Sequence, residues 1–171
     1  MNKHIFILNG MGGSGKDTFA EFLNQIVPTF HYSSVTKVKK IAEECGWAGG
    51  KTEKDRKFLS DLKNLLTEYN DLPFKAVAMA VRAFDIYCDL PTKGWIMLID
   101  IREPAEIERA KKAFGAKTIL IKNDRVPFIA SNMADAGVYD CDYDIVIENN
   151  GTLDDFRETV KKFAEEYLNE R

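Results

Sequence analysis

Residues 10–18 read GMGGSGKDT, and this glycine-rich segment with its lysine is the part of the chain best suited to chemistry. It fits the pattern G-x-x-x-x-G-K, with an aspartate where Ser or Thr usually follows the lysine. Its four glycines would permit backbone conformations closed to other residues, so that N–H groups can surround a phosphate. Lys16 would add a positive charge at a helix start, where the helix dipole already favours anions. The predicted phosphate-binding residues are Gly10, Gly12, Gly13, Ser14, Gly15, Lys16, Asp17 and Thr18.

Asp17 is unusual beside a phosphate, because its carboxylate repels the anion unless a cation or a hydrogen bond compensates. A hydroxyl at this position commonly holds Mg²⁺, whereas a carboxylate can hold the ion through water or leave that task to Thr18. A second acid, Asp100, ends the apolar run WIMLID, where a carboxylate can support magnesium or activate a substrate. We therefore expect Asp17, Thr18 and Asp100 around a magnesium ion. The alternative role for Asp100 is to cap the helix that starts near Pro104.

Two arginines follow predicted strands. Arg102 lies at a helix start, where a cation opposes the helix dipole, so a bound anion is the favoured explanation for it. Arg125 begins the connection DRVPFIASNMADAGVYDCDYD, which is long enough for a lid or a binding loop. We predict that Arg125 contacts a transferring phosphoryl group, with a surface ion pair to Asp124 as the alternative.

Lys37 and Arg56 lie between the second and third predicted strands. Charge runs are usually solvated faces, but these two residues are candidates for contact with an acceptor phosphate. Asn150, in the turn ENNGT at 148–152, is predicted from its position to border a bound base. His4 and His31 lie at strand margins, and we expect them to be bystanders.

Short apolar runs alternate along the chain with longer segments of helical spacing, and these elements must position the candidate residues. Continuous runs rich in Ile, Val and aromatic residues suit strands covered on both faces, as in a parallel sheet. Strands separated by helices predict an α/β sandwich with right-handed crossovers. Ligands of such folds bind beyond the carboxyl ends of the strands. The predicted strands are 5–8, 30–34, 95–100, 118–122 and 144–148, and the predicted helices are 16–26, 36–45, 52–70, 73–88, 103–114 and 152–168.

The length of 171 residues, of which 45% are hydrophobic, predicts one domain over 1–171 that can build its own core. Lys and Arg number 24 against 27 Asp and Glu, and the net charge of -3 offers no broad electrostatic surface to a nucleic-acid polymer. Cys45, Cys88 and Cys141 are widely spaced and odd in number, which favours free thiols. No apolar run suits a membrane span or a signal peptide, so we expect a cytoplasmic protein.

Several separated segments together resemble the deoxynucleoside monophosphate kinase group of the P-loop nucleoside monophosphate kinase superfamily. The likeness lies in SGKDT with FAEFL behind it, SSVTKVKKIAEECGW, DRKFL, LIDIREPAE and DYDIVIENNGTLDDF, in order over most of the chain. The resemblance implies a fold similar to that of adenylate kinase, a three-layer sandwich with a five-stranded parallel sheet. It also implies an acceptor region over about residues 35–90 and a lid over about 124–143.

The activity implied by the resemblance is phosphoryl transfer from ATP, with Mg²⁺, to a (deoxy)nucleoside monophosphate in nucleotide metabolism. Lys16 and the loop amides would hold the donor phosphates, while Lys37 and Arg56 would face the acceptor with Arg102. The partners would be small nucleotides, and the chain would be a monomer or a homodimer. The residues that the resemblance makes catalytic are Lys16, Asp100, Arg102 and Arg125.

Other functions stay open on the residues alone. Related P-loop kinases act on phosphomevalonate or dephospho-CoA, and the acceptor cannot be read from this sequence. Arg125 is the only basic residue from there to Asp144, which suggests a nucleotide-binding module with weak turnover. A GTP-dependent switch would need [NT]KxD, but residues 121–124 read IKND. A dinucleotide loop fits the spacing G-x-G-x-x-G, but the position of Lys16 argues against it.

Overall fold

The computed structural model describes residues 3–88, 94–126 and 137–169. The chain forms two compact units. The first unit comprises Met1–His31 and Tyr87–Arg171, and the second comprises Tyr32–Ile86. The second unit covers nearly the same residues as the acceptor region expected from the sequence. Residues 127–136 of the expected lid lie outside the described residues.

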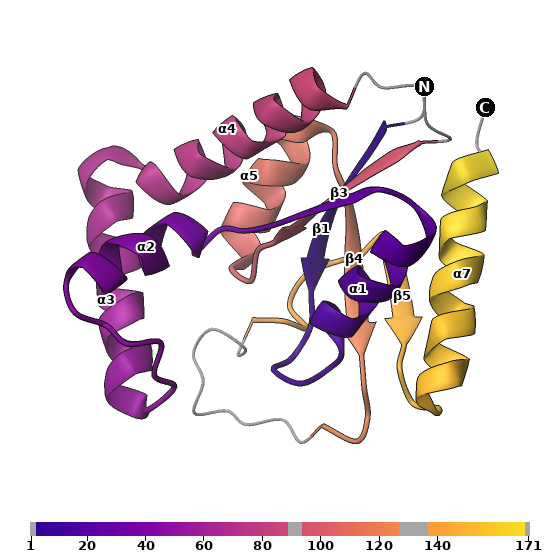
Figure 1. Cartoon of the computed structure of the whole chain (residues 1–171). Helices are drawn as coiled ribbons and strands as arrows, with labels where there is room; N and C mark the ends of the chain where they lie inside the picture. Colours follow the sequence, from indigo (N-terminus) through magenta and orange to yellow (C-terminus); the bar gives the residue numbers. More distant parts are fainter. Residues whose placement is uncertain (1–2, 89–93, 127–136, 170–171) are drawn as a thin grey trace. The chain divides into compact units, whose positions relative to one another are not determined.

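A five-stranded parallel sheet carries the candidate loop residues (Figure 1). Its spatial order is β2-β3-β1-β4-β5. Each strand coincides with a predicted one to within two residues, so the predicted α/β fold and five-stranded sheet are confirmed. The strands are β1 (Lys3–Asn9), β2 (Thr29–Ser33), β3 (Trp95–Asp100), β4 (Lys117–Lys122) and β5 (Ile145–Glu148).

The central strands β1, β3 and β4 are buried over most of their length, as their continuous apolar runs predict. The prediction of burial on both faces is wrong for β2 and β5. Both strands lie at sheet edges, and they have exposed positions such as Phe30 (41% exposed) and Val146 (53% exposed). An edge strand has only one neighbour, so part of its apolar surface stays in contact with water.

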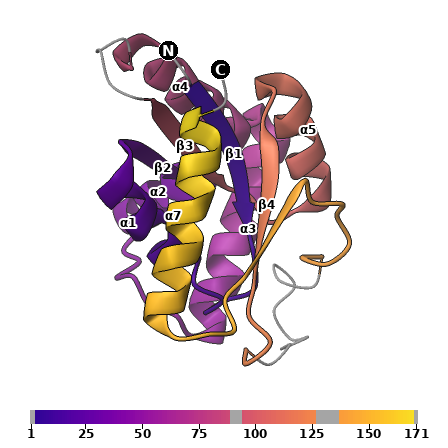
Figure 2. The ribbon, with the colours of Figure 1, turned by 90° about the vertical axis from the view of Figure 1, so that its right-hand side faces the viewer.

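Helices of the first unit cover both faces of this sheet, and Figure 2 shows α7 and α5 on opposite sides of β1 and β4. These helices are α1 (Lys16–Ile26), α5 (Pro104–Phe114) and α7 (Leu153–Asn169). α1 and α7 contact each other, and their aromatic residues join Phe6 and Leu8 of β1 in one core cluster. Side chains alternate between the faces of a strand. Ile7 is therefore buried on the opposite face from Phe6, and α5 contacts β1 and β4.

The second unit is mainly helical, with α2 (Thr36–Glu44), α3 (Glu53–Asn70) and most of α4 (Leu72–Tyr87). α2 and α3 contact each other. α3 begins with a capping box, in which Thr52 and Asp55 exchange side-chain and backbone hydrogen bonds. Asp71 ends α3 in the left-handed conformation (φ 59°), and this allows α4 to start at the next residue.

All six predicted helices are confirmed, with boundaries that agree to within one residue. Thr152 receives a hydrogen bond from the backbone N–H of Asp155, as expected for a cap at the start of α7. The three cysteines are free. Within the ranges that the structure describes, no helix combines the length and the apolar character needed to cross a membrane.

Candidate phosphate-binding site

The loop between β1 and α1 adopts a conformation that depends on glycine. Gly10, Gly13 and Gly15 have positive φ angles of 150°, 82° and 106°. A Cβ atom on Gly10 would lie 2.5 Å from the carbonyl oxygen of Ile121, so no other residue fits there without displacing β4. The expectation of a special conformation is wrong for Gly12, which is not among the described glycines with positive φ.

Gly15 precedes α1, and no side chain caps the N-terminus of that helix. The N–H groups of the first turn are therefore available to an anion, which the helix dipole also attracts. Nδ2 of Asn149 donates to the carbonyl oxygen of Ser14 at 2.9 Å. A Cβ on Gly15 would come within 2.5 Å of that same nitrogen. Asn149, which sequence reasoning missed in favour of its neighbour Asn150, thus braces the loop from the end of β5.

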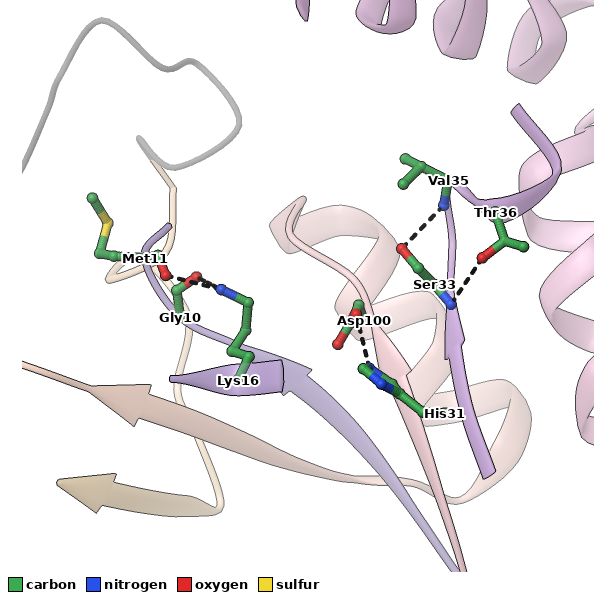
Figure 3. Close-up of polar contacts among 8 residues, drawn as sticks. All are labelled: Gly10, Met11, Lys16, His31, Ser33, Val35, Thr36 and Asp100. Atoms are coloured by element: carbon green, nitrogen blue, oxygen red, sulfur yellow. Dashed lines mark hydrogen bonds and ion pairs between the residues drawn. The ribbon is translucent and has the colours of Figure 1, made fainter. Parts of the chain in front are cut away.

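Lys16 lies folded over the loop, as Figure 3 shows. Its ammonium group donates to the carbonyl oxygens of Gly10 (2.5 Å) and Met11 (2.9 Å). The hydroxyl oxygen of Ser14 is buried without a hydrogen-bond partner among the described residues. An unpartnered buried hydroxyl and a lysine held over positive-φ glycines fit a phosphate, which accepts hydrogen bonds from both.

A series of hydrogen bonds, centred on a buried asparagine, fixes the start of the loop. No sequence pattern indicated these hydrogen bonds. Asn9 is fully buried, and its Oδ1 accepts from the N–H of Gly10 at 2.8 Å. Its Nδ2 donates to the hydroxyl of Tyr143 (2.8 Å), which donates in turn to the carbonyl of Val138 (2.6 Å). Burial raises the pKa of Tyr143, which keeps this hydroxyl protonated and able to donate. The loop is thus anchored to residues 138–143 of the same unit.

Asp100 ends β3, in register with Leu8 two residues before the loop. The Nε2–H of His31, from the middle of β2, donates to its Oδ2 at 2.9 Å (Figure 3). Oδ1 of Asp100 is buried without a hydrogen-bond partner among the described residues. The cap of α5 is Glu103, so Asp100 does not take its alternative role as a helix cap. His31 is also not the isolated residue that the sequence suggested.

Asp17 faces a hollow of about 260 Å³ beside α1 and β2. The hydrogen bond to Asp100 raises the pKa of His31 above its ordinary 6.5 despite burial, and the charges of Asp100 and Asp17 add to the rise. Asp17 therefore shares this hollow with an imidazole of the chain itself. The hollow is lined by Asp17, Ala20, Glu21, Asn24, Thr29 and His31.

The predicted magnesium residues come from α1 and from the end of β3. No group of three or more His, Cys, Asp or Glu side chains suited to a metal occurs in the part of the chain that the structure describes. Mg²⁺ at a nucleotide is held mainly by phosphates and water, with one or two protein ligands. The hydroxyl of Thr18, one turn into α1, and the open oxygen of Asp100 fit such a sparse site. Arg102 is half-buried two residues beyond Asp100.

Among the described contacts, Arg125 does not form the ion pair with Asp124 that is the alternative to its predicted phosphoryl contact. Its guanidinium donates to the carbonyl oxygens of Asn149 (3.3 Å) and Gly151 (2.9 Å). Asp124 pairs instead with Lys122, with 3.1 Å between Nζ and Oδ1. Asn150, predicted to border a base, holds Asp124 through its side chain. These contacts join the β4 and β5 ends into one support beside the phosphate loop.

The second unit has a hollow of its own, of about 330 Å³. Lys37, one of the two predicted acceptor residues, lies at this hollow together with Lys75, which sequence reasoning missed. Arg56, the other predicted residue, is exposed on α3 and is not among the lining residues. Burial raises the pKa of Tyr32 in the wall, which therefore stays protonated. The lining residues are Tyr32, Lys37, Leu72, Lys75, Ala76, Met79 and Ala80.

Comparison with known proteins identifies the fold. No family model matches the chain, and no curated protein matches it in sequence. Among solved structures, the dephospho-CoA kinase of Campylobacter jejuni matches with a TM-score of 0.59 at 18% identity, over 96% of this chain and 97% of that one. The Deinococcus radiodurans tunicamycin resistance protein matches at 0.52 and 13% identity, over 94% and 95% of the two chains.

Shikimate kinase from Aquifex aeolicus also matches, with a TM-score of 0.50 at 14% identity over 95% of this chain and 96% of that one. All three likenesses span nearly the whole of both chains, so they concern the complete fold and not only the phosphate loop. The glycine conformations, the folded lysine and the sheet order agree with this likeness. The chain has the fold of the small P-loop kinases.

Proposed function

We propose that this chain is an ATP-dependent kinase that phosphorylates a small anionic acceptor, and that the acceptor is a (deoxy)nucleoside monophosphate. The single observation that carries the proposal is the phosphate loop, with positive-φ glycines, an uncapped helix start and Lys16 folded over two carbonyls. Those features suit a polyphosphate tail. The resemblance of SGKDT and LIDIREPAE to deoxynucleoside monophosphate kinases supports the choice of acceptor.

The second-unit hollow supports an acceptor that combines a flat body with an anionic group. Leu72, Ala76 and Ala80 supply apolar surface along one side of α4, and Tyr32 supplies an aromatic ring. Lys37 and Lys75 supply positive charge. A nucleobase packs well against such a surface, and the phosphate of a nucleotide pairs with lysine. We therefore assign this hollow to the acceptor.

The reaction makes one phosphorus–oxygen bond and breaks another. An oxygen of the acceptor phosphate attacks the terminal phosphorus of ATP, the bond to the β–γ bridging oxygen breaks, and ADP leaves. The attacking oxygen is already ionised, so no base has to remove a proton. The task of the chain is positioning and charge neutralisation, for which we assign Lys16, Arg102 and Arg125.

Mg²⁺, when bound with the nucleotide, neutralises charge that develops on the phosphate oxygens. Thr18 and Asp100 are the residues that would hold it, directly or through water. Asp17 would act on the ion indirectly, since its side chain faces the hollow that is also lined by His31.

A hydroxyl acceptor is the second candidate, and one observation favours it. A hydroxyl must lose its proton on attack, and Asp100 has a buried, unpartnered oxygen that can accept it while His31 holds the other oxygen.

A panel assay separates these functions. ADP formation from ATP with Mg²⁺ is measured with nucleoside and deoxynucleoside monophosphates, phosphomevalonate and dephospho-CoA, and with GTP alone as a control. Acceptor-dependent ADP from a monophosphate supports the proposal, whereas turnover with dephospho-CoA alone supports the hydroxyl candidate. ATP binding without turnover on any acceptor would contradict the kinase proposal and leave a nucleotide-binding module. Hydrolysis of GTP without an acceptor would replace it with a switch.

A further inference from the structure

The contact between His31 and Asp100 joins the middle of β2 to the end of β3, and the two residues lie 69 positions apart in the sequence. Both residues belong to the first unit, and β2 and β3 are neighbours in the sheet. Their side chains are 31% and 21% exposed, so neither is a core packing residue. Figure 3 shows the imidazole and the carboxylate facing each other at the sheet edge where β1 leads into the phosphate loop.

The two oxygens of Asp100 are in different situations. Oδ2 is held by His31, whereas Oδ1 is buried without a hydrogen-bond partner among the described residues. A buried carboxylate oxygen without a partner is destabilising, so a ligand that completes the hydrogen bonding of this oxygen in the working state would recover that cost. A carboxylate also rotates readily about its last bond, and a hydrogen bond to one oxygen fixes the direction of the other.

The charges near His31 fit the same role. Asp17 and Asp100 both lie close enough to act on the imidazole electrostatically. His31 is placed to orient one of these carboxylates, that of Asp100.

We propose that His31 is a positioning residue, which holds Oδ2 of Asp100 so that Oδ1 stays available to the hydrated Mg²⁺ of a bound nucleotide. The inference rests on the proposed function, because it concerns the same donor site. It assigns a role in that site to a residue that does not contact the nucleotide. A purely structural role, a bridge between β2 and β3, would instead affect stability and leave the magnesium dependence of binding unchanged.

The test compares His31→Ala and His31→Gln with Asp100→Asn and the double variant His31→Ala/Asp100→Asn. The side-chain N–H of glutamine lies nearly as far from the backbone as Nε2 of histidine. It should therefore restore the hydrogen bond to Asp100 that alanine removes. Glu21→Gln is the matched control, since Glu21 lines the same hollow and is exposed. Thermal unfolding shows that each variant is folded. Affinity for a non-hydrolysable ATP analogue is measured with and without Mg²⁺, and kcat and KM are measured with the acceptor identified by the panel.

We expect His31→Ala to lower kcat about 30-fold, with the KM for ATP changed less than about 3-fold. Analogue affinity with Mg²⁺ should fall about 5-fold, while affinity without Mg²⁺ stays the same. His31→Gln should stay within about 5-fold of the unaltered chain in kcat. In the Asp100→Asn background, His31→Ala should lower kcat by less than a further factor of about 2, because both changes remove the same interaction.

The proposal would be overturned if the kcat losses of the two single variants multiplied in the double variant. Equal losses of analogue affinity with and without Mg²⁺ in His31→Ala would overturn it as well. Glu21→Gln would also overturn it if this variant lost as much kcat and magnesium-dependent affinity as His31→Ala. Any change in the lining of the hollow would then have the same consequence. The failure of the proposed function is distinguishable, because it appears as silence across the acceptor panel in the unaltered chain. The magnesium-dependent binding measurement still decides the role of His31 in that case.

Discussion

The phosphate loop of the first unit and the hollow of the second unit are built in different ways. The loop is fixed by backbone geometry, because Gly10 lies against Ile121 and Asn149 bonds to Ser14. The hollow is rimmed by exposed, rotatable side chains such as Lys75 and Met79, the latter 72% exposed. Backbone amides suit any polyphosphate, whereas side chains on a helix can change without altering the fold. Under the proposed function, donor recognition is therefore general and acceptor recognition depends on a few side chains.

Burial follows the same division. The first unit contains the aromatic cluster of Phe6, Phe19 and Phe163, which fixes the sheet against α1 and α7. In the second unit, large apolar side chains stay in contact with water, including Tyr69 (82% exposed) and Ile86 (66% exposed). A residue in a dense core transmits any displacement to its neighbours, and an exposed residue does not. Substitutions in the donor region should therefore have the larger effects, in an order that can be tested.

The largest expected effect is that of Lys16→Ala. Removing this ammonium group should lower kcat about 10³-fold, because its charge acts directly on the transferring phosphoryl group. The unfolding temperature should hardly change, because the ammonium group donates to carbonyls of the loop itself. ADP formation and thermal unfolding are measured together, with Lys39→Ala on the exposed face of α2 as the control. Retained turnover would show that the donor site is misplaced.

Arg125→Ala comes next, and it distinguishes two roles of the arginine. As a cation that stabilises the transition state, its loss should lower kcat about 100-fold and change ATP affinity little. As a brace of the carbonyls of Asn149 and Gly151, its loss should loosen the support of Ser14. ATP affinity would then fall as much as kcat. Steady-state kinetics give kcat, and calorimetry of ATP binding gives the affinity for ATP.

Gly15→Ala tests the backbone geometry of the loop. The alanine would have to adopt a φ near 106° and would place its Cβ 2.5 Å from Asn149 Nδ2. We expect a loss of about 2–3 kcal/mol in unfolding free energy together with weaker ATP binding. The matched control is Gly115→Ala, at a φ of 62° with open space around it, which should cost about 1 kcal/mol and leave ATP binding intact. Equal effects on ATP binding would contradict the role of the Asn149 contact.

Lys75→Ala should have the smallest effect and should be confined to the acceptor. Loss of one exposed lysine from the rim of the hollow should raise the KM for the acceptor about 10-fold, the size of one charge-assisted hydrogen bond. The KM for ATP and the stability should not change. Initial rates at varied concentrations of each substrate make the distinction, with Lys39→Ala again as the control. A parallel rise in the KM for ATP would break the division between donor and acceptor recognition.

Local pattern was enough to predict the strands, the helices and the phosphate loop, because the physics that sets them is local. WIMLID and TILIK are continuous apolar runs, and only a strand covered on both faces buries such a run. GMGGSGKDT combines glycines with a lysine at a fixed spacing, so a phosphate loop is the simplest structure that it can form. Thr152 and Asp155 mark the start of α7 in the same way, through hydrogen bonds over three residues.

What the tertiary structure alone decided is which distant side chains meet. His31 joins Asp100, and Tyr143 joins Asn9, because the folded sheet brings segments that are far apart in the sequence side by side. The choice of Asn149 over Asn150 at the phosphate loop depends on which of two adjacent residues faces it at the end of β5, and the turn sequence alone does not fix this. Periodicity is a property of neighbours along the chain, whereas a site is a property of neighbours in space. The sequence therefore determined the glycine-rich loop, and the fold determined the side chains that surround it.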